Sequence, residues 1–84
     1  MSVNMREHED LRPLQYGDRI EITWYHFARY TYVVAHDDVR GTHLRKEKGE
    51  GYAFLERTDR DDLLQQLLLS TEGDWPLIEE FKIL

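Results

Sequence analysis

Three histidines and two adjacent aspartates have side chains that could bind a metal ion. Imidazole and carboxylate are ligands of zinc-like ions. His36 and His43 lie on either side of a turn predicted at Asp37–Asp38, so they can approach each other across a hairpin. His26 would have to join them, because a zinc site needs at least three converging ligands. The chain has no cysteine and no HExxH motif, so we predict neither a metal nor a cofactor.

A small ribonuclease is the enzymatic alternative. Histidine can act as general base and acid, and arginine can stabilise phosphate charge. His26 and His43 supply the first type, and Arg29, Arg40 and Arg45 the second. These types are common in a chain with 33% charged residues, so their presence alone does not indicate a site. We predict a non-enzymatic protein, with a ribonuclease-like or metal-dependent enzyme as the third alternative.

A basic hairpin at residues 40–48 makes nucleic-acid binding the second alternative. Its candidate residues are Arg40, His43, Arg45, Lys46 and Lys48. Five aromatic residues lie just before it, between positions 24 and 32, and aromatics on a sheet beside basic groups are typical of single-strand binders. The net charge of −6 opposes non-specific binding, and most of these aromatics fall on the face expected to form the core.

The C-terminal third carries most of the acidity. Residues 58–84 have a net charge of −5, of which the acids at 59–62 are explained by the start of a helix. The other acids surround aromatic residues, a combination that can attract and hold a basic partner. The candidate partner-binding residues are Glu72, Asp74, Trp75, Glu79, Glu80 and Phe81. Trp75 is the expected anchor, and the alternative is that Trp75 closes one end of the core.

The leading hypothesis is a small acidic protein that binds a macromolecular partner, in the first place a basic protein. Its sharpest version is an inhibitor of a nucleic-acid-handling or defence protein, of the phage anti-defence type. A homodimer formed through an edge strand is a further alternative. Without cysteine or a long apolar stretch, we expect a cytoplasmic protein with no membrane partner.

A single small α+β domain must position these residues. The 84 residues predict a flexible arm over 1–12 and one domain over 13–84. Alternating apolar residues predict strands over 19–25 and 28–34. Either a turn without the usual turn residues joins them at 25–28, or the two form one long strand that bends through a bulge.

The remaining chain predicts two strands, a helix and a last element. Residues 42–47 suit a polar edge strand in which only Leu44 is buried, and residues 52–56 suit a returning strand. Capping residues and a leucine stripe predict an amphipathic helix over 59–71. Residues 77–84 fit a strand or a helix, and we favour the strand. The expected fold is an antiparallel sheet or SH3-like barrel of about five strands with one helix.

The strand alternation and the leucine stripe together predict the core. The expected members are Ile20, Ile22, Trp24, Tyr30, Tyr32, Val34, Phe54, Leu63, Leu64, Leu67 and Leu68.

Overall fold

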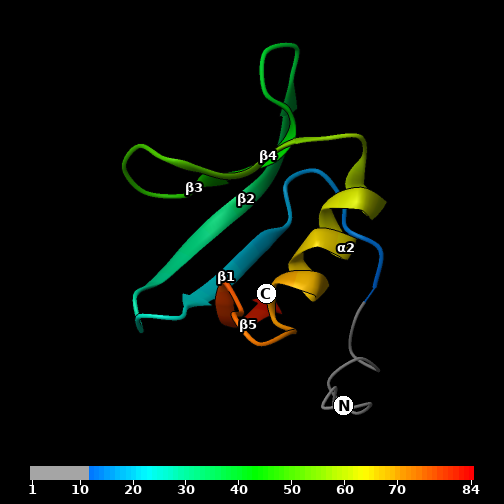
Figure 1. Cartoon of the computed structure of the whole chain (residues 1–84). Coiled ribbons are helices and arrows are strands. Elements are labelled where there is room, and N and C mark those ends of the chain that lie inside the picture. The colour runs from blue at the N-terminus through cyan, green and yellow to red at the C-terminus, as the bar shows by residue number, and fades with distance from the viewer. Residues whose placement is uncertain (1–11) are drawn as a thin grey trace.

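A computed structural model describes residues 12–84, so all but the last residue of the predicted arm lies outside the described residues. Five antiparallel strands form one curled sheet, a half-barrel, in the order β4-β3-β2-β1-β5, and helix α2 packs against β4 and β3 (Figure 1). The elements are β1 (Arg19–Trp24), β2 (Arg29–Asp37), β3 (Gly41–Lys46), β4 (Tyr52–Arg57), α2 (Arg60–Ser70) and β5 (Ile78–Ile83). The prediction of a small α+β fold is confirmed.

Strands β1 and β2 form a hairpin, so the single bent strand is wrong for this segment. Ile20 pairs with Tyr32 in an antiparallel register. Two backbone hydrogen bonds of 2.8 Å close the turn, from Trp24 N to Ala28 O and from Phe27 N to Trp24 O. Phe27 has a φ of 71°, the left-handed conformation that glycine usually supplies in such turns. The turn therefore forms without the usual residues, at the cost of backbone strain.

The last element is a strand, as favoured, and the helical alternative for residues 77–84 is wrong. In β5, Ile83 pairs with Ile20 and Phe81 pairs with Ile22 of β1. The register shifts opposite the junction of Thr23 and Trp24, where β5 carries a bulge. This pairing makes β5 one edge of the sheet, beside the first strand in sequence.

Strand β3 is an inner strand between β2 and β4, so the predicted polar edge strand is wrong. Thr42 and His43 are 0% and 1% exposed. The Thr42 hydroxyl lies 3.1 Å from both the Tyr16 hydroxyl and His36 Nδ1, and His43 Nδ1 lies 2.8 Å from the Gly41 carbonyl oxygen. Because each polar group has a partner, it can be buried without a large desolvation penalty.

Helix α2 begins where the sequence predicts. Asp59 is its N-cap, and its Oδ1 accepts a hydrogen bond of 2.8 Å from the Asp62 backbone N–H. The Asp62 carboxylate in turn accepts one of 2.9 Å from the Thr58 N–H. The first bond satisfies an N–H group that a helix start leaves unpaired, and the second ties the residue before the cap to the first turn. The helix buries Leu63 and Leu67 against the sheet.

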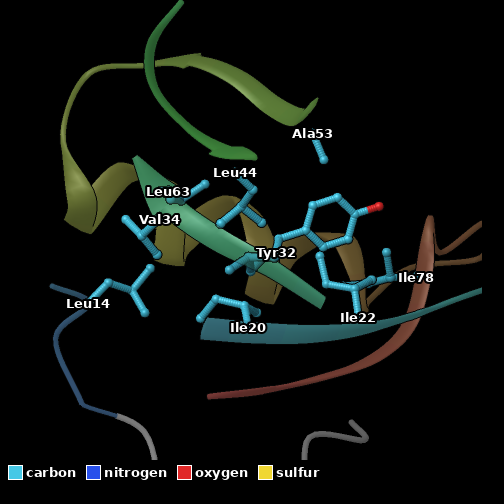
Figure 2. Packing of buried hydrophobic residues seen from close by; sticks show 10 residues of the cluster. Leu14, Ile20, Ile22, Tyr32, Val34, Leu44, Ala53, Leu63 and Ile78 are labelled. Atoms are coloured by element: carbon cyan, nitrogen blue, oxygen red, sulfur yellow. The ribbon is translucent and has the colours of Figure 1, made fainter. Parts of the chain in front are cut away.

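The core lies between the curled sheet and α2 (Figure 2). Most predicted members are buried or pack against the buried cluster, but Tyr30 is 44% exposed and Leu68 is not in the cluster. The last residue of β3, Lys46, pairs with Tyr32. Tyr30 lies two residues further along β2, so no residue of β3 pairs with it, and it is exposed. The buried apolar residues outside the predicted core are Leu14, Leu44, Ala53 and Ile78, and of these only Leu44 is expected to be buried from its own strand pattern.

We expect Leu67→Ala to lower the free energy of unfolding by about 2–5 kcal/mol, because Leu67 is 0% exposed and its removal leaves a cavity. Leu69→Ala is the matched control, since Leu69 lies on the same helix and is 54% exposed. Urea denaturation of both variants measures the difference. Equal losses for the two leucines would contradict the packing of α2 described above.

Candidate partner-binding surface

Trp75 is almost completely exposed in the loop between α2 and β5. Its exposed fraction is 92%, the highest of the large apolar side chains described, and that of Leu77 is 58%. The loop is held at its end by a 2.9 Å hydrogen bond from Leu77 N to Ser70 O and by the pairing of Ile78 with Trp24. The alternative in which Trp75 closes the core is therefore wrong.

The other tryptophan, Trp24, is held inside the fold. Its indole Nε1 donates a hydrogen bond of 3.1 Å to the Tyr32 hydroxyl. Its ring stacks on Phe54, with centroids 6.2 Å apart. The two tryptophans thus have opposite environments, which makes Trp75 a distinct reporter of any surface contact.

The β1–β2 turn lies at the same end of the sheet as the Trp75 loop. Trp24 ends β1 and pairs with Ile78, which begins β5, so Tyr25 and Leu77 leave the sheet beside each other. Tyr25 is 60% exposed and Phe27 is 78% exposed. Figure 1 shows the cyan turn and the orange loop in the lower half of the molecule. We call the exposed residues Tyr25, Phe27, Trp75 and Leu77 the aromatic end.

Phe27 is unusual within the aromatic end. It combines a left-handed backbone with a phenyl ring that is 78% exposed. A glycine or asparagine would relieve the strain, and so exposed a ring contributes little to packing. Phe54 and Glu56 of β4 share the positive φ, but of these three residues only Phe27 is an exposed aromatic.

Acidic side chains lie beside the aromatic end. Glu72, Asp74, Glu79 and Glu80 are exposed and form no ion pair with any residue of 12–84. Of the predicted partner-binding residues, Phe81 differs, because it is half-buried and packs against the core. Glu72 and Asp74 thus lie in the same loop as Trp75, Glu79 and Glu80 lie on the strand that follows it, and Phe81 is partly buried.

The predicted basic hairpin does not form one continuous surface. The Arg40 guanidinium pairs with Asp37 at 2.8 Å and lies 4.2 Å from the centre of the Tyr52 ring. His43 is buried, and Arg45 is exposed on β3. Lys46 and Lys48 instead belong to a cleft of about 320 Å³, which we call the basic cleft. It is lined by Arg19, Arg29, Tyr30, Thr31, Lys46, Glu47 and Lys48.

Cations from three separate segments meet in the basic cleft. Arg19 Nη2 donates to Glu47 Oε1 at 3.0 Å, Arg29 Nε donates to Thr23 Oγ1 at 3.2 Å, and Lys46 Nζ lies 4.0 Å from the Tyr30 ring centre. The ion pair with Glu47 balances the charge of Arg19. Within the described residues, the other three cations form no ion pair with a carboxylate, although Lys48 is close enough to Glu47 to help lower the pKa of that side chain. Arg19 and Arg29 are not among the predicted nucleic-acid-binding residues, although each occupies an outward position in the strand alternation.

The histidines do not converge on one site. His36 contacts Thr42, His43 is buried on the adjacent strand, and His26 lies in the β1–β2 turn. Among residues 12–84 no three histidine, aspartate or glutamate side chains are placed to hold a metal ion.

Comparisons with protein-family models, curated proteins and solved structures find no match in any of the three. In the described part of the chain, α2 is too short and too polar to cross a membrane.

The pH dependence of stability follows from Asp37, which holds the β2–β3 turn. Its Oδ1 accepts hydrogen bonds from Arg40 N at 2.6 Å and Val39 N at 3.0 Å. The Arg40 backbone N–H is the main cause that lowers the pKa of Asp37 below its ordinary value of 3.8, and the Arg40 guanidinium adds to it. A lowered pKa in the folded state stabilises the fold above about pH 3.8, and this contribution disappears as the pH falls below it.

We expect Asp37→Asn to reduce the loss of stability between neutral pH and acid, because the variant has no carboxylate to protonate. Part of the loss remains, since Asp18 also has a lowered pKa through its hydrogen bond with Arg12. Urea midpoints measured from pH 7 to pH 2 test this. Asp38→Asn is the control, because the neighbouring Asp38 is exposed. An equal loss of stability on acidification in Asp37→Asn and wild type would contradict this role of Asp37.

Proposed function

We propose that this protein is a small non-enzymatic module that binds another protein through its aromatic end. The observation that supports this is the 92% exposure of Trp75. Exposing a tryptophan to water is unfavourable, and clustered exposed apolar residues mark interaction sites in small domains. Tryptophan and tyrosine are also the residues most enriched among those that dominate binding energy. Four such apolar side chains from two loops give the partner a continuous contact.

The charges indicate the chemistry of the partner. Glu72, Asp74 and Glu79 lie around the aromatic end without an ion-pair partner in residues 12–84. A partner with an apolar pocket surrounded by lysine and arginine complements this surface. The pocket would supply most of the affinity, and the charges would mainly accelerate association.

A nucleic-acid-handling protein is the narrower form of this proposal. Such proteins concentrate lysine and arginine around the groove that receives phosphate, so an acidic surface with an apolar anchor can compete for that groove. An inhibitor of the phage anti-defence type would act in this way. The fold suits such a role, because both loops of the aromatic end project from the same rigid sheet.

The strand order supports the finer prediction of an SH3-like barrel. Four strands form a meander, and the fifth returns beside the first after a helical connection. The curled sheet leaves its loops free to vary, so binding residues in the 25–28 and 71–77 segments need not disturb the core.

Trp75→Ala is expected to abolish partner capture and leave the melting temperature nearly unchanged. The matched control is Val39→Ala, since Val39 is 84% exposed in the turn at the other end of β2. Immobilised wild-type and variant proteins are incubated with host extract, and retained proteins are identified by mass spectrometry. The candidate partner is a protein that wild type and Val39→Ala retain and that Trp75→Ala does not retain.

Fluorescence provides a second measurement with that purified partner. Trp75 emission is expected to shift to shorter wavelength and to become protected from acrylamide when the partner covers it, whereas Trp24 is already shielded. Glu72→Lys with Asp74→Lys is expected to slow association. A partner that binds equally well to Trp75→Ala, with the variant still folded, would place the binding surface elsewhere.

Nucleic-acid binding is the second candidate, and the basic cleft is the observation that favours it. Arg29, Lys46 and Lys48 form no ion pair within residues 12–84 and line the same cleft as Tyr30. Backbone phosphates can contact the cations, and a base can stack on the half-exposed Tyr30 ring. Lys46 already lies over that ring and would have to move, so we expect weaker binding than at a preformed site.

We expect weak binding of a single-stranded oligonucleotide that decreases steeply with salt. Lys46→Gln with Lys48→Gln should weaken it and reduce the slope of log K against log salt, by about 0.7 for each phosphate that the variant no longer neutralises. Arg60→Gln removes a positive charge on α2, outside the cleft, and is the control. Fluorescence anisotropy over a salt series measures both. Unchanged affinity in the double variant would exclude the basic cleft as the binding site.

A further inference from the structure

The two edges of the sheet differ in how well they are protected. At the β4 edge the register shifts between Thr42 and Leu44, Phe54 and Glu56 have positive φ angles, and α2 packs alongside. Such distortions prevent another strand from pairing. Strand β5 is regular after its bulge at Glu79, and in residues 12–84 no further strand pairs with it. The β5 edge is therefore available to another chain.

The direction of the backbone groups on β5 follows from one hydrogen bond. Leu84 N donates to Arg19 O at 2.9 Å, so Leu84 directs its N–H toward β1. Successive residues of a strand alternate, so Lys82 and Glu80 also direct their backbone groups toward β1. Phe81 and Ile83 direct theirs away from the sheet. These two residues supply the donors and acceptors for an additional strand.

We propose that a second copy of this chain pairs antiparallel with β5, with Phe81 opposite Phe81 of that copy. A two-fold axis perpendicular to the sheet relates two such strands and keeps every side chain on its own face. In this register the two Phe81 residues exchange both backbone hydrogen bonds, which completes a regular pair. The two half-barrels then share one continuous sheet.

Charge complementarity selects this register. With Phe81 at the centre, Glu80 lies opposite Lys82 of the other copy, and Lys82 lies opposite Glu80. Both pairs occupy non-hydrogen-bonded positions, where Cα atoms are about 4.5 Å apart and side chains approach most closely. Both side chains are exposed on the outer face of β5, and neither forms an ion pair within residues 12–84.

The neighbouring symmetric registers are unfavourable. A register centred on Glu80 places Glu80 opposite its own copy, and one centred on Lys82 places Lys82 opposite its own copy. Like charges directly opposite each other destabilise a strand pair. On the inner face, the half-buried Phe81 and Ile83 would extend the apolar core across the interface. The bulge at Glu79 keeps the regular pairing short, so the expected dimer is weak.

Charge reversal tests the register directly. Sedimentation velocity of the full chain over a concentration series gives the dimer dissociation constant. Glu80→Lys and Lys82→Glu are each expected to raise it by about tenfold or more, because two attractive pairs become repulsive. The double variant Glu80→Lys/Lys82→Glu is expected to restore it. An equimolar mixture of the two single variants is expected to form the heterodimer, which restores both pairs.

Two controls separate this proposal from its alternatives. Glu72→Lys makes the same charge change outside β5 and is expected to leave the dimer intact. Trp75→Ala is also expected to leave it intact, because the aromatic end lies outside the pairing. A wild-type chain that stays monomeric at all concentrations would overturn the proposal. So would a dimer abolished by Trp75→Ala, or one insensitive to both single reversals while circular dichroism shows every variant folded.

Discussion

The fold and its candidate surface both depend on the pairing of β1 with strands on its two sides. β2 follows β1 directly in the chain, whereas β5 returns after more than half of the chain has intervened. Ile20 and Ile22, which β1 contributes to the core, are 0% exposed. The pairing of Trp24 with Ile78 also joins the end of β1 to the start of β5. Two loops distant in sequence therefore leave the sheet side by side.

Charges of both signs without an ion-pair partner occur on the described surface. A net charge of −6 describes a protein that repels nucleic acid as a whole, yet three cations gather in one cleft without an ion pair in residues 12–84. The unpaired acids lie around the aromatic end instead. The two groups approach each other at Thr23, which pairs with Arg29 on one side and with Glu80 on the other.

Buried polar side chains have hydrogen-bond partners, whereas several large apolar side chains are exposed to solvent. Thr42 and His43 are buried because neighbouring groups satisfy their hydrogen bonds, and no described buried side chain lacks a partner. At the surface, the exposed Phe27 and Trp75 reverse the usual arrangement of apolar residues. Every buried polar side-chain atom described thus has a hydrogen-bond partner. The apolar side chains that lack packing partners, such as Phe27 and Trp75, lie at the surface.

Local pattern in the sequence determined the strand faces of Ile20 and Val34 and the start of α2 at Asp59, because alternation and helix capping act over a few residues. It also identified Trp75 and its acidic neighbours as a candidate surface. Only the tertiary structure decided that Tyr30 is exposed, that His43 is buried and that Arg29 and Lys46 line one cleft. These outcomes depend on where one strand ends relative to its neighbour and on which strands become adjacent. Strand register is set by packing between distant segments, and a local pattern does not specify it.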